Sequence, residues 1–538
     1  MDASKTNLCF MRFEDRAERI TATQVADTFV SVGPLMDLLD SRNNQIMYGR
    51  RGTGKTHALR YMEAKKNELG DIAIFIDAQN IGSNGSIYND STIPVAERAT
   101  RLLVDICAAI HGRLLDIFTD PARGWNLSAV IPLMDNFVSG FSETRVIGNV
   151  EQESHSKATE NFKSGTTFTG KLSQSPEFGV GATLEGSSSA EEQSRYKISG
   201  QSESWISFQY FSKAIRALAD YISPKRLWFL IDEWTTVPSE IQPYLADLIR
   251  RSMFPVPNIT TKIAAIEHRA RFKLERPNDG YIGFELGADI SASINLDDYL
   301  VIDNNEERAL NFFRHFVTNH AVAVADELGI AFGPTESIVS TAFTQDNVFV
   351  EFVRATEGVP RDAMHILALS AQRANNNQIS MPGIRAAAHA FFTSEKYTTI
   401  QANPANRRLL DWIFDEVIGR RRTRAFLLPV GTSDPIIDRL FDQRALHILN
   451  RSRSAAHRPG ERFVVYKLDY GLYVDLVATD KFPTGLLVEE RFGKDIEFDV
   501  PLDDARSYRR AILDLNDFYR VYPDIKATQD TAPIGSAL

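Results

Sequence analysis

Short apolar runs alternate with amphipathic stretches through the first half of the chain. Residues 46–48, 71–76 and 227–234 are nearly continuous apolar segments with the length of buried strands. Helical spacing of apolar residues follows the first segment as far as Leu69, and it follows the second from Val95 to Ile117. This order of strands and helices predicts an α/β core with a parallel sheet covered by helices.

Helical spacing dominates the chain after residue 300. It covers Glu306–Leu328 and Val348–Arg373, which predicts an all-helical lid at residues 301–400. Gly358-Val359-Pro360 interrupts the second stretch, and proline suits the first position of a new helix. Arg361 then lies in the first turn, where a cation is unfavourable to the helix dipole and a contact with an anion would offset that cost.

A third pattern begins at about residue 403. It predicts two helices followed by two strands, at 407–417, 434–450, 463–467 and 472–477. Helices followed by a hairpin look like a winged helix, here residues 401–480. The C-terminal extension, residues 481–538, is expected to hold a helix at 508–520 and a disordered tail from about Lys526.

Residues 142–204 are unusually rich in Ser, Gly, Thr, Glu and Gln, a composition that a flexible linker also has. Period-two spacing nevertheless favours short antiparallel strands with one apolar face, formed by Phe168, Leu172, Phe178, Val180, Ala182, Leu184, Tyr196 and Ile198. We therefore predict a polar β-ribbon insertion. Its few lysines are balanced by acids, so a protein effector suits it at least as well as a nucleic acid.

The segment IMYGRRGTGKTHALR, residues 46–60, fits G-x-x-x-x-G-K-[ST] between a strand and a helix. Its glycines let backbone N–H groups turn toward phosphate oxygens at a helix N-terminus. We expect Lys55 to reach the β- and γ-phosphates of ATP and Thr56 to ligate Mg²⁺. The expected nucleotide site comprises Gly49, Arg50, Arg51, Gly52, Thr53, Gly54, Lys55, Thr56 and His57. Residues 29–39 either pack beside the base of the nucleotide or form a helix on the sheet.

The strand-like segment LWFLIDEW, residues 227–234, ends in two carboxylates. A buried parallel strand one crossover after a phosphate loop delivers such side chains beside that loop. We expect Asp232 to hold Mg²⁺ through water and Glu233 to polarise the attacking water.

Composition limits the class of protein. A chain of 538 residues predicts two to four domains, and no apolar run approaches the eighteen residues of a membrane span. The N-terminus is too polar and acidic for a targeting peptide, so a cytoplasmic location is expected. The two cysteines, Cys9 and Cys107, exclude a disulfide framework. The formal net charge of −10 argues against nucleic-acid binding by the whole surface, though not by a local patch.

GRRGTGKT, LWFLIDEW, the strand-like KIAAIE at Lys262–Glu267 and the Gly358–Arg361 segment together resemble an AAA+ ATPase. The likeness extends from about Thr28 to Thr479. It is closest to the clade of origin-recognition and archaeal replication initiators, including bacterial ATPases of that type. The resemblance implies a P-loop core at residues 1–300, with the ribbon as an insertion in it, and a homo-oligomer formed on ATP binding.

The resemblance also implies further site residues. The sensor of the γ-phosphate at the end of the fourth strand, usually Asn, Thr or Ser, falls here at Glu267 or His268. An arginine finger for the neighbouring subunit would be Arg269, Arg271 or Arg276. Arg361 corresponds to the lid residue that couples closure to bound ATP and assists catalysis with Lys55 and Glu233; its alternative is an arginine at a surface helix end.

Residues 407–462 contain twelve arginines, no lysine and seven acids, an excess of five positive charges in an acidic protein. Arg420, Arg421, Arg422 and Arg424 form the densest group. Such a concentration on a winged helix suits duplex DNA, with a recognition helix in the major groove. Winged helices also dock proteins, and arginines also serve in salt bridges.

Two functions follow from these features. The first is an ATP-driven enzyme that acts on duplex DNA. The second is a nucleotide-gated switch or scaffold that docks a protein effector, and the resemblance suggests anti-phage defence as one setting. No nuclease, protease or nucleotide-cyclising motif is present, so a destructive activity would come from a partner.

Overall fold

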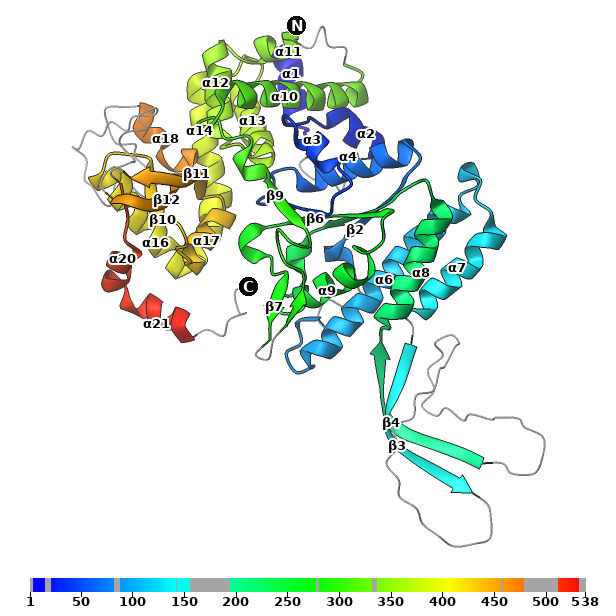
Figure 1. The fold of residues 1–538 in the computed structure, drawn as a ribbon. Coiled ribbons are helices and arrows are strands. Elements are labelled where there is room, and N and C mark those ends of the chain that lie inside the picture. The colour runs from blue at the N-terminus through cyan, green and yellow to red at the C-terminus, as the bar shows by residue number, and fades with distance from the viewer. Residues whose placement is uncertain are drawn as a thin grey trace. The chain divides into compact units, whose positions relative to one another are not determined.

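The structure is a computed structural model, and it describes residues 3–14, 21–81, 88–141, 143–154, 194–276, 280–330, 336–455, 458–478 and 511–531. The chain forms two compact units (Figure 1). The first comprises Met1–Lys65, Ile263–Arg269 and Ala292–Leu538, and the second comprises Lys66–Lys262 and Ala270–Ser291. The boundary between the units therefore falls inside the segment that the sequence predicts as one core.

A five-stranded sheet has the strand order β2-β5-β6-β1-β9. Its strands are β1 (Gln45–Tyr48), β2 (Ile72–Asp77), β5 (Leu227–Asp232), β6 (Ile259–Ala265) and β9 (Ser291–Asn295). Strands β2 and β5 pair in parallel, from Ile72 opposite Leu227 to Asp77 opposite Asp232. Strands β1, β5 and β6 are buried at every position, which explains their nearly continuous apolar sequences. The predicted α/β core with a parallel sheet is confirmed.

The second unit surrounds its strands with helices. These are α6 (Val95–Thr119), α7 (Leu127–Ser139), α8 (Phe208–Ile222) and α9 (Gln242–Ser252), and a small hairpin pairs β7 (Lys273–Glu275) with β8 (Tyr281–Gly283). Helices α6 and α8 bury one apolar face each, including Ile106, Ile110, Phe211 and Ile215.

A long antiparallel ribbon stands between β2 and β5 in the sequence (Figure 1). Strand β3 (Glu143–Ser154) pairs with β4 (Ser194–Trp205) without a register shift, from Glu143 opposite Trp205 to Ser154 opposite Ser194. The predicted β-ribbon is thus found at both ends of the insertion. The apolar positions Phe168 to Leu184, on which that prediction depended, lie outside the described residues.

The first unit contains the helical region that follows the sheet. Its helices are α1 (Ala3–Phe10), α2 (Ala22–Thr28), α3 (Leu35–Leu39), α4 (Lys55–Glu68), α10 (Glu306–Leu328), α11 (Glu336–Ala342), α12 (Asp346–Ala355), α13 (Pro360–Ala374), α14 (Met381–Phe391) and α15 (Thr398–Gln401), with a π-helix at Phe392–Tyr397. Helix α1 joins this group because the Asn7 side chain donates to the carbonyls of Asn375 and Asn377. Pro360 is the first residue of α13, as predicted.

A C-terminal module, residues 404–478, follows. Its elements are α16 (Pro404–Phe414), a π-helix at Asp415–Arg420, β10 (Ala425–Pro429), α17 (Pro435–Asp442), β11 (Leu446–Ala455), β12 (Arg458–Leu468) and α18 (Tyr470–Ala478), with the sheet order β10-β12-β11. The antiparallel sheet with helices is consistent with a winged helix. Two predicted elements are wrong: the helix expected over 434–450 ends at Asp442 and gives way to β11, and the strand expected at 472–477 is helix α18.

The C-terminal extension returns to this sheet. Leu427 of β10 donates its N–H to Ala511, and Leu513 donates to Leu427, so residues 511–513 cover the outer edge of β10. Helices α20 (Leu515–Val521) and α21 (Pro523–Thr531) follow. The expected disorder from Lys526 is wrong as far as Thr531, because α21 continues to that residue. In the described parts of the chain, no helix combines the length and apolar character that crossing a bilayer requires.

Candidate functional site

The phosphate-loop sequence forms a turn between β1 and α4 in the first unit. Strand β1 ends at Tyr48 and α4 begins at Lys55. Gly52 and Gly54 have φ angles of +87° and +94°, which L-residues with side chains rarely adopt. The sequence folds this way because glycine alone accepts these angles without strain. The turn precedes the N-terminus of a 14-residue helix, as an anion site of this type requires.

Lys55 lies within the loop. Its side chain is buried, and its Nζ atom lies 2.8 Å from the Gly49 carbonyl oxygen and 2.9 Å from that of Arg50. Thr53 donates its hydroxyl to the same Arg50 carbonyl. The ammonium group therefore places a positive charge within the turn, where phosphate oxygens are expected.

The first turn of α13 meets the loop. The Arg361 N–H donates to the Gly52 carbonyl at 3.2 Å. A Cβ atom at Gly52 would lie 2.8 Å from the Cβ of Arg361 and 3.3 Å from Val359 Cγ1. Gly52 is thus required by its φ angle and by the close approach of α13. The structure brings the predicted lid residue Arg361 to the phosphate loop.

A mostly apolar cavity adjoins the loop within the first unit. Its wall includes Phe29, Gly54, His57, Tyr299 and Phe316. Phe29 stacks on Tyr61 of α4 with ring centroids 4.1 Å apart. Phe29, Val30, Val32 and Leu35 line this cavity, and Leu35–Leu39 is helical, so packing beside a base stays a prediction.

His57 extends one wall of this cavity. Burial lowers the pKa of its imidazole, and the ring nitrogen Nε2 lies 3.0 Å from the Val25 carbonyl. The neutral ring therefore donates to that carbonyl and fixes α2 against α4.

Residues 13–69 match the ORC-CDC6-like family model. The N-terminal region of the chain is ORC-CDC6-like. This region contains α2, α3, β1, the phosphate loop and α4, which are the elements that build the loop and one wall of the cavity. A comparison with the curated proteins finds no match.

The two predicted carboxylates belong to the second unit, whereas the ORC-CDC6-like region lies almost wholly in the first. Asp232 ends β5 and is 1 % exposed, and its Oδ1 accepts the N–H of Glu233 at 2.9 Å. Glu233 has a φ of +51°, an unusual angle for a residue with a side chain. This left-handed angle turns the chain sharply directly after the strand.

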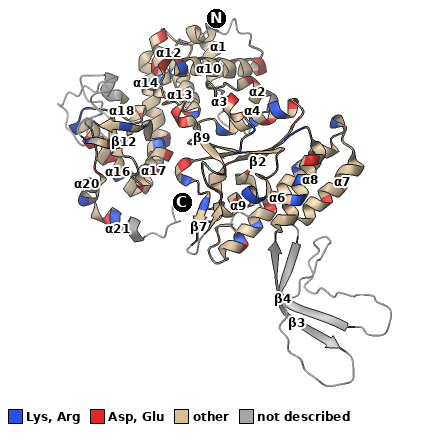
Figure 2. Cartoon of the chain, viewed as in Figure 1, with Lys and Arg blue, Asp and Glu red and all other residues tan. Residues whose placement is uncertain are grey.

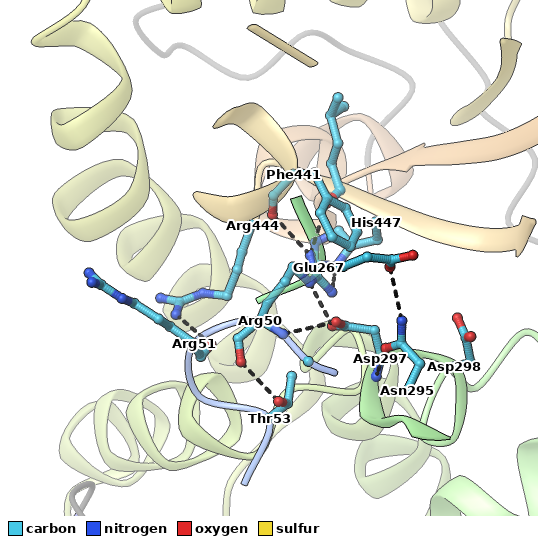
Figure 3. Close-up of polar contacts among 12 residues, drawn as sticks. Arg50, Arg51, Thr53, Glu267, Asn295, Asp297, Asp298, Phe441, Arg444 and His447 are labelled. Atoms are coloured by element: carbon cyan, nitrogen blue, oxygen red, sulfur yellow. Dashed lines mark hydrogen bonds and ion pairs between the residues drawn. The ribbon is translucent and has the colours of Figure 1, made fainter. Parts of the chain in front are cut away.

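The position of the γ-phosphate sensor departs from the usual residue types. Glu267 follows β6, accepts a hydrogen bond from the Asn295 side chain at 3.1 Å and forms an ion pair with Arg451 at 2.9 Å (Figure 3). The alternative, His268, lies 3.5 Å from Asp438. Asn295 was missed by sequence reasoning. It ends β9, the short strand SASIN, and a polar residue at a strand end was the available signal.

The three candidate finger arginines differ in their surroundings. Arg269 forms an ion pair with Asp442 of α17 in the same unit. Arg271 and Arg276 are exposed and belong to the second unit, where the Arg271 N–H donates to the Gln242 side chain. An arginine finger requires a side chain that can reach another subunit, so these two fit that role better than Arg269.

Arg50 was expected at the nucleotide, but its side chain points away from the inside of the loop. It is 2 % exposed and reaches the C-terminal module, where Nη1 donates to the Leu446 carbonyl at 2.9 Å (Figure 3). Its backbone N–H and its Nε both donate to Asp297, at 2.9 and 2.6 Å. The side chain of Arg50 is therefore an internal anchor of the loop.

Several arginines of the 407–462 region also form ion pairs with acidic side chains of the same chain. Glu416 pairs with both Arg420 and Arg421, and Arg424 pairs with Asp303. Figure 2 shows Lys and Arg interspersed with Asp and Glu over the described helices. The second predicted helix of this region is not a basic one: α17 carries Asp438 and Asp442. The counted excess of positive charge therefore overstates the charge available to DNA.

Proposed function

We propose that the protein binds ATP with Mg²⁺ and hydrolyses it. One observation carries this proposal: the phosphate loop, the apolar cavity and the first turn of α13 meet within one compact unit. A cavity that combines apolar walls with a phosphate loop suits a nucleoside triphosphate. The ORC-CDC6-like match, whose family consists typically of ATPases, supports the same conclusion.

Each residue has a stated role in this proposal. Lys55 and the loop N–H groups bind the phosphates, and Arg361 reaches the γ-phosphate from α13. Thr56 and Asp232 would hold Mg²⁺, which would neutralise charge on the phosphate oxygens. Among the described residues, no group of three or more His, Cys, Asp or Glu side chains is arranged to hold a metal ion. The Thr56 hydroxyl and the Asp232 carboxylate are oxygen donors, which together with phosphate oxygens suit Mg²⁺. Glu233 would accept a proton from the attacking water.

Two substitutions test the chemistry. Lys55→Ala should lose ATP binding and turnover, whereas Glu233→Gln should retain binding and lose turnover by at least about 100-fold. Glu275→Gln is the matched control, because Glu275 is an exposed acid of the same unit as Glu233. Fluorescent-nucleotide titration and phosphate release measure the two quantities. Turnover by Glu233→Gln at the wild-type rate would exclude Glu233 as the base.

We further propose duplex DNA as a partner of the β11–β12 hairpin. Arg453, Arg458 and Arg462 lie near its end, where Ser454 pairs opposite Arg462 and Ala455 opposite Arg458. Arg458 and Arg462 are exposed. Arginines on an exposed hairpin can follow a phosphate backbone without a recognition helix.

Salt dependence tests this contact. Each arginine that binds a phosphate contributes about 0.9 to the slope of log affinity against log salt concentration, so replacing these three by Ala should reduce the slope by about three. Changing Arg420 and Arg421 to Ala is the control, because the nearly buried Glu416 carboxylate engages both, whereas Glu461, the partner of Arg458, is half exposed. Equal slopes for the hairpin variant and the wild type would exclude the hairpin as the DNA contact.

The second candidate function is a nucleotide-gated switch that docks a protein effector. The internal ion pairs of the arginine-rich region favour it, because they leave less charge for nucleic acid. Comparing the ATPase rate with and without duplex DNA separates the two functions. Stimulation by DNA supports the enzyme that acts on DNA, and an unchanged rate together with no DNA binding supports the switch.

A further inference from the structure

The C-terminal module reaches the phosphate loop through Arg50. Besides its bond to Leu446, the guanidinium lies 3.2 Å from His447 Nδ1 and stacks 4.3 Å above the Phe441 ring. Phe441 is in α17 and His447 in β11, whereas Arg50 is the second residue of the loop. The loop is therefore fixed by groups that are almost 400 positions away in the sequence.

A chain of buried polar contacts continues from His447. Its Nε2 lies 2.9 Å from Asp469, Asp469 lies 2.6 Å from Lys396, and Lys396 lies 2.7 Å from Asp362. These four side chains are each at most 4 % exposed. Asp362 follows Arg361 in the first turn of α13, so the chain runs from the loop to the helix that contacts the loop.

Arg444 connects Asp362 back to the phosphate loop. Its Nε lies 3.2 Å from Asp362, and its Nη1 donates to the Arg51 carbonyl at 3.1 Å (Figure 3). We call the closed set the polar ring; its members are Arg50, His447, Asp469, Lys396, Asp362 and Arg444. The ring begins and ends on adjacent residues of the phosphate loop.

The protonation states in the ring follow from geometry. A guanidinium only donates, so His447 Nδ1 accepts from Arg50 and its Nε2–H donates to Asp469. Burial alone would raise the pKa of Asp469, but Lys396 and His447 overcome it and hold that pKa below its usual range. The neutral imidazole is thus locked between a cation and an anion. Removing Lys396 would take the ammonium group away from two buried carboxylates, Asp362 and Asp469, which is far more costly than losing a surface pair.

A second connection runs parallel to the ring. Arg451 of β11 pairs with Glu267 at the end of β6 and with Asp298 at 2.9 Å. Asp297, the neighbour of Asp298, holds Arg50. The module therefore contacts the loop, the first turn of α13 and the end of β6.

We propose that the C-terminal module positions the phosphate loop through the polar ring, so that nucleotide binding and docking of the module stabilise each other. This inference rests on the proposed nucleotide site. His447 and Arg444 are positioning residues, because His447 acts through the Arg50 side chain and Arg444 through the Arg51 carbonyl. Linkage requires reciprocity: if the docked module tightens nucleotide binding by some factor, the nucleotide tightens docking by the same factor.

The test uses the full chain and Arg444→Met. Arg444 is less deeply buried than the other ring members, so this variant is the one best able to fold. We expect a fluorescent ATP analogue to bind it at least about fivefold more weakly than the wild type. Arg444→Lys should recover part of the affinity, because an ammonium can still pair with Asp362. Arg407→Met is the control, since Arg407 pairs with Asp411 on the exposed side of α16 in the same module.

Hydrogen exchange supplies a readout that needs no nucleotide. In nucleotide-free protein, Arg444→Met should increase exchange in residues 49–56, and in wild type ATP should slow exchange in residues 441–447. Unchanged loop exchange in Arg444→Met and in His447→Gln would overturn the inference. If the wild type binds no nucleotide but exchange in residues 49–56 still rises in Arg444→Met, the proposed nucleotide function is wrong and the positioning role of the polar ring is supported. Circular dichroism identifies a variant that has not folded, in which case His447→Gln decides.

Discussion

The contact between the phosphate loop and α13 makes a quantitative prediction for Gly52→Ala. At φ +87° an alanine costs about 1–2 kcal/mol in left-handed backbone strain. Its Cβ would also lie 2.8 Å from the Arg361 Cβ, and relieving such overpacking costs about a further 1–3 kcal/mol. Gly54→Ala is a matched control, because its φ of +94° imposes the same strain while no atom lies within 4 Å of the added Cβ.

The assay is hydrogen exchange of the Arg361 amide in nucleotide-free protein, because this amide donates to the Gly52 carbonyl. A difference of 1.4 kcal/mol in local opening corresponds to a tenfold change in rate. We expect exchange in Gly52→Ala to be about 5- to 140-fold faster than in Gly54→Ala. Equal rates would refute the claim that α13 packs against the loop at this position. Nucleotide-free conditions matter, since the Gly54 methyl group would also face phosphate oxygens.

Three further predictions concern other parts of the chain. Burial first, and then the charge of Arg50, lower the pKa of His447 to about 3, so below about pH 6.5 the unfolded chain binds a proton that the folded chain does not bind. The free energy of unfolding should therefore fall by about 2 kcal/mol from its value above pH 6.5 to its value at pH 5, and denaturant titrations of His447→Gln should lack this part of the loss. Gly283→Ala should strongly lower the melting temperature of the second unit, because the added Cβ would lie 1.9 Å from the Phe272 carbonyl oxygen at a φ of +106°. A melting temperature equal to that of the wild type would contradict the described hairpin. Cys9 and Cys107 are buried, and burial raises the pKa of both thiols, so a thiol reagent should label neither cysteine in native protein and both in denaturant. Rapid labelling of the native protein would show that the helices around these cysteines open.

The features predicted correctly from the sequence are local ones. Strands β1, β2 and β5 are buried, so their apolar sequences identify them, and the phosphate loop carries its chemistry in eight consecutive residues. Pro360 and the segment before it also specify the start of α13 locally.

The errors arose where packing overrides a local pattern. The segment at Leu446 continues the apolar spacing of α17, and only its pairing with β12 makes it a strand. Tyr470–Ala478 has a strand-like composition, which led to the prediction of a strand at 472–477. In the structure Gly471 lets α18 approach α14, since a Cβ there would lie 2.6 Å from the Ala388 carbonyl oxygen. The polar ring joins residues far apart in sequence, so no window of sequence contains its signal.

The pairing of residues 511–513 with β10 has a consequence for how the protein is handled. Those few residues occupy a row of backbone donors and acceptors at the border of the module's sheet. A chain cut before Ala511 would leave that row open, and an open strand border readily recruits a strand from another molecule. Shortened versions of this protein should therefore end after Leu513 if they are to remain dispersed in solution.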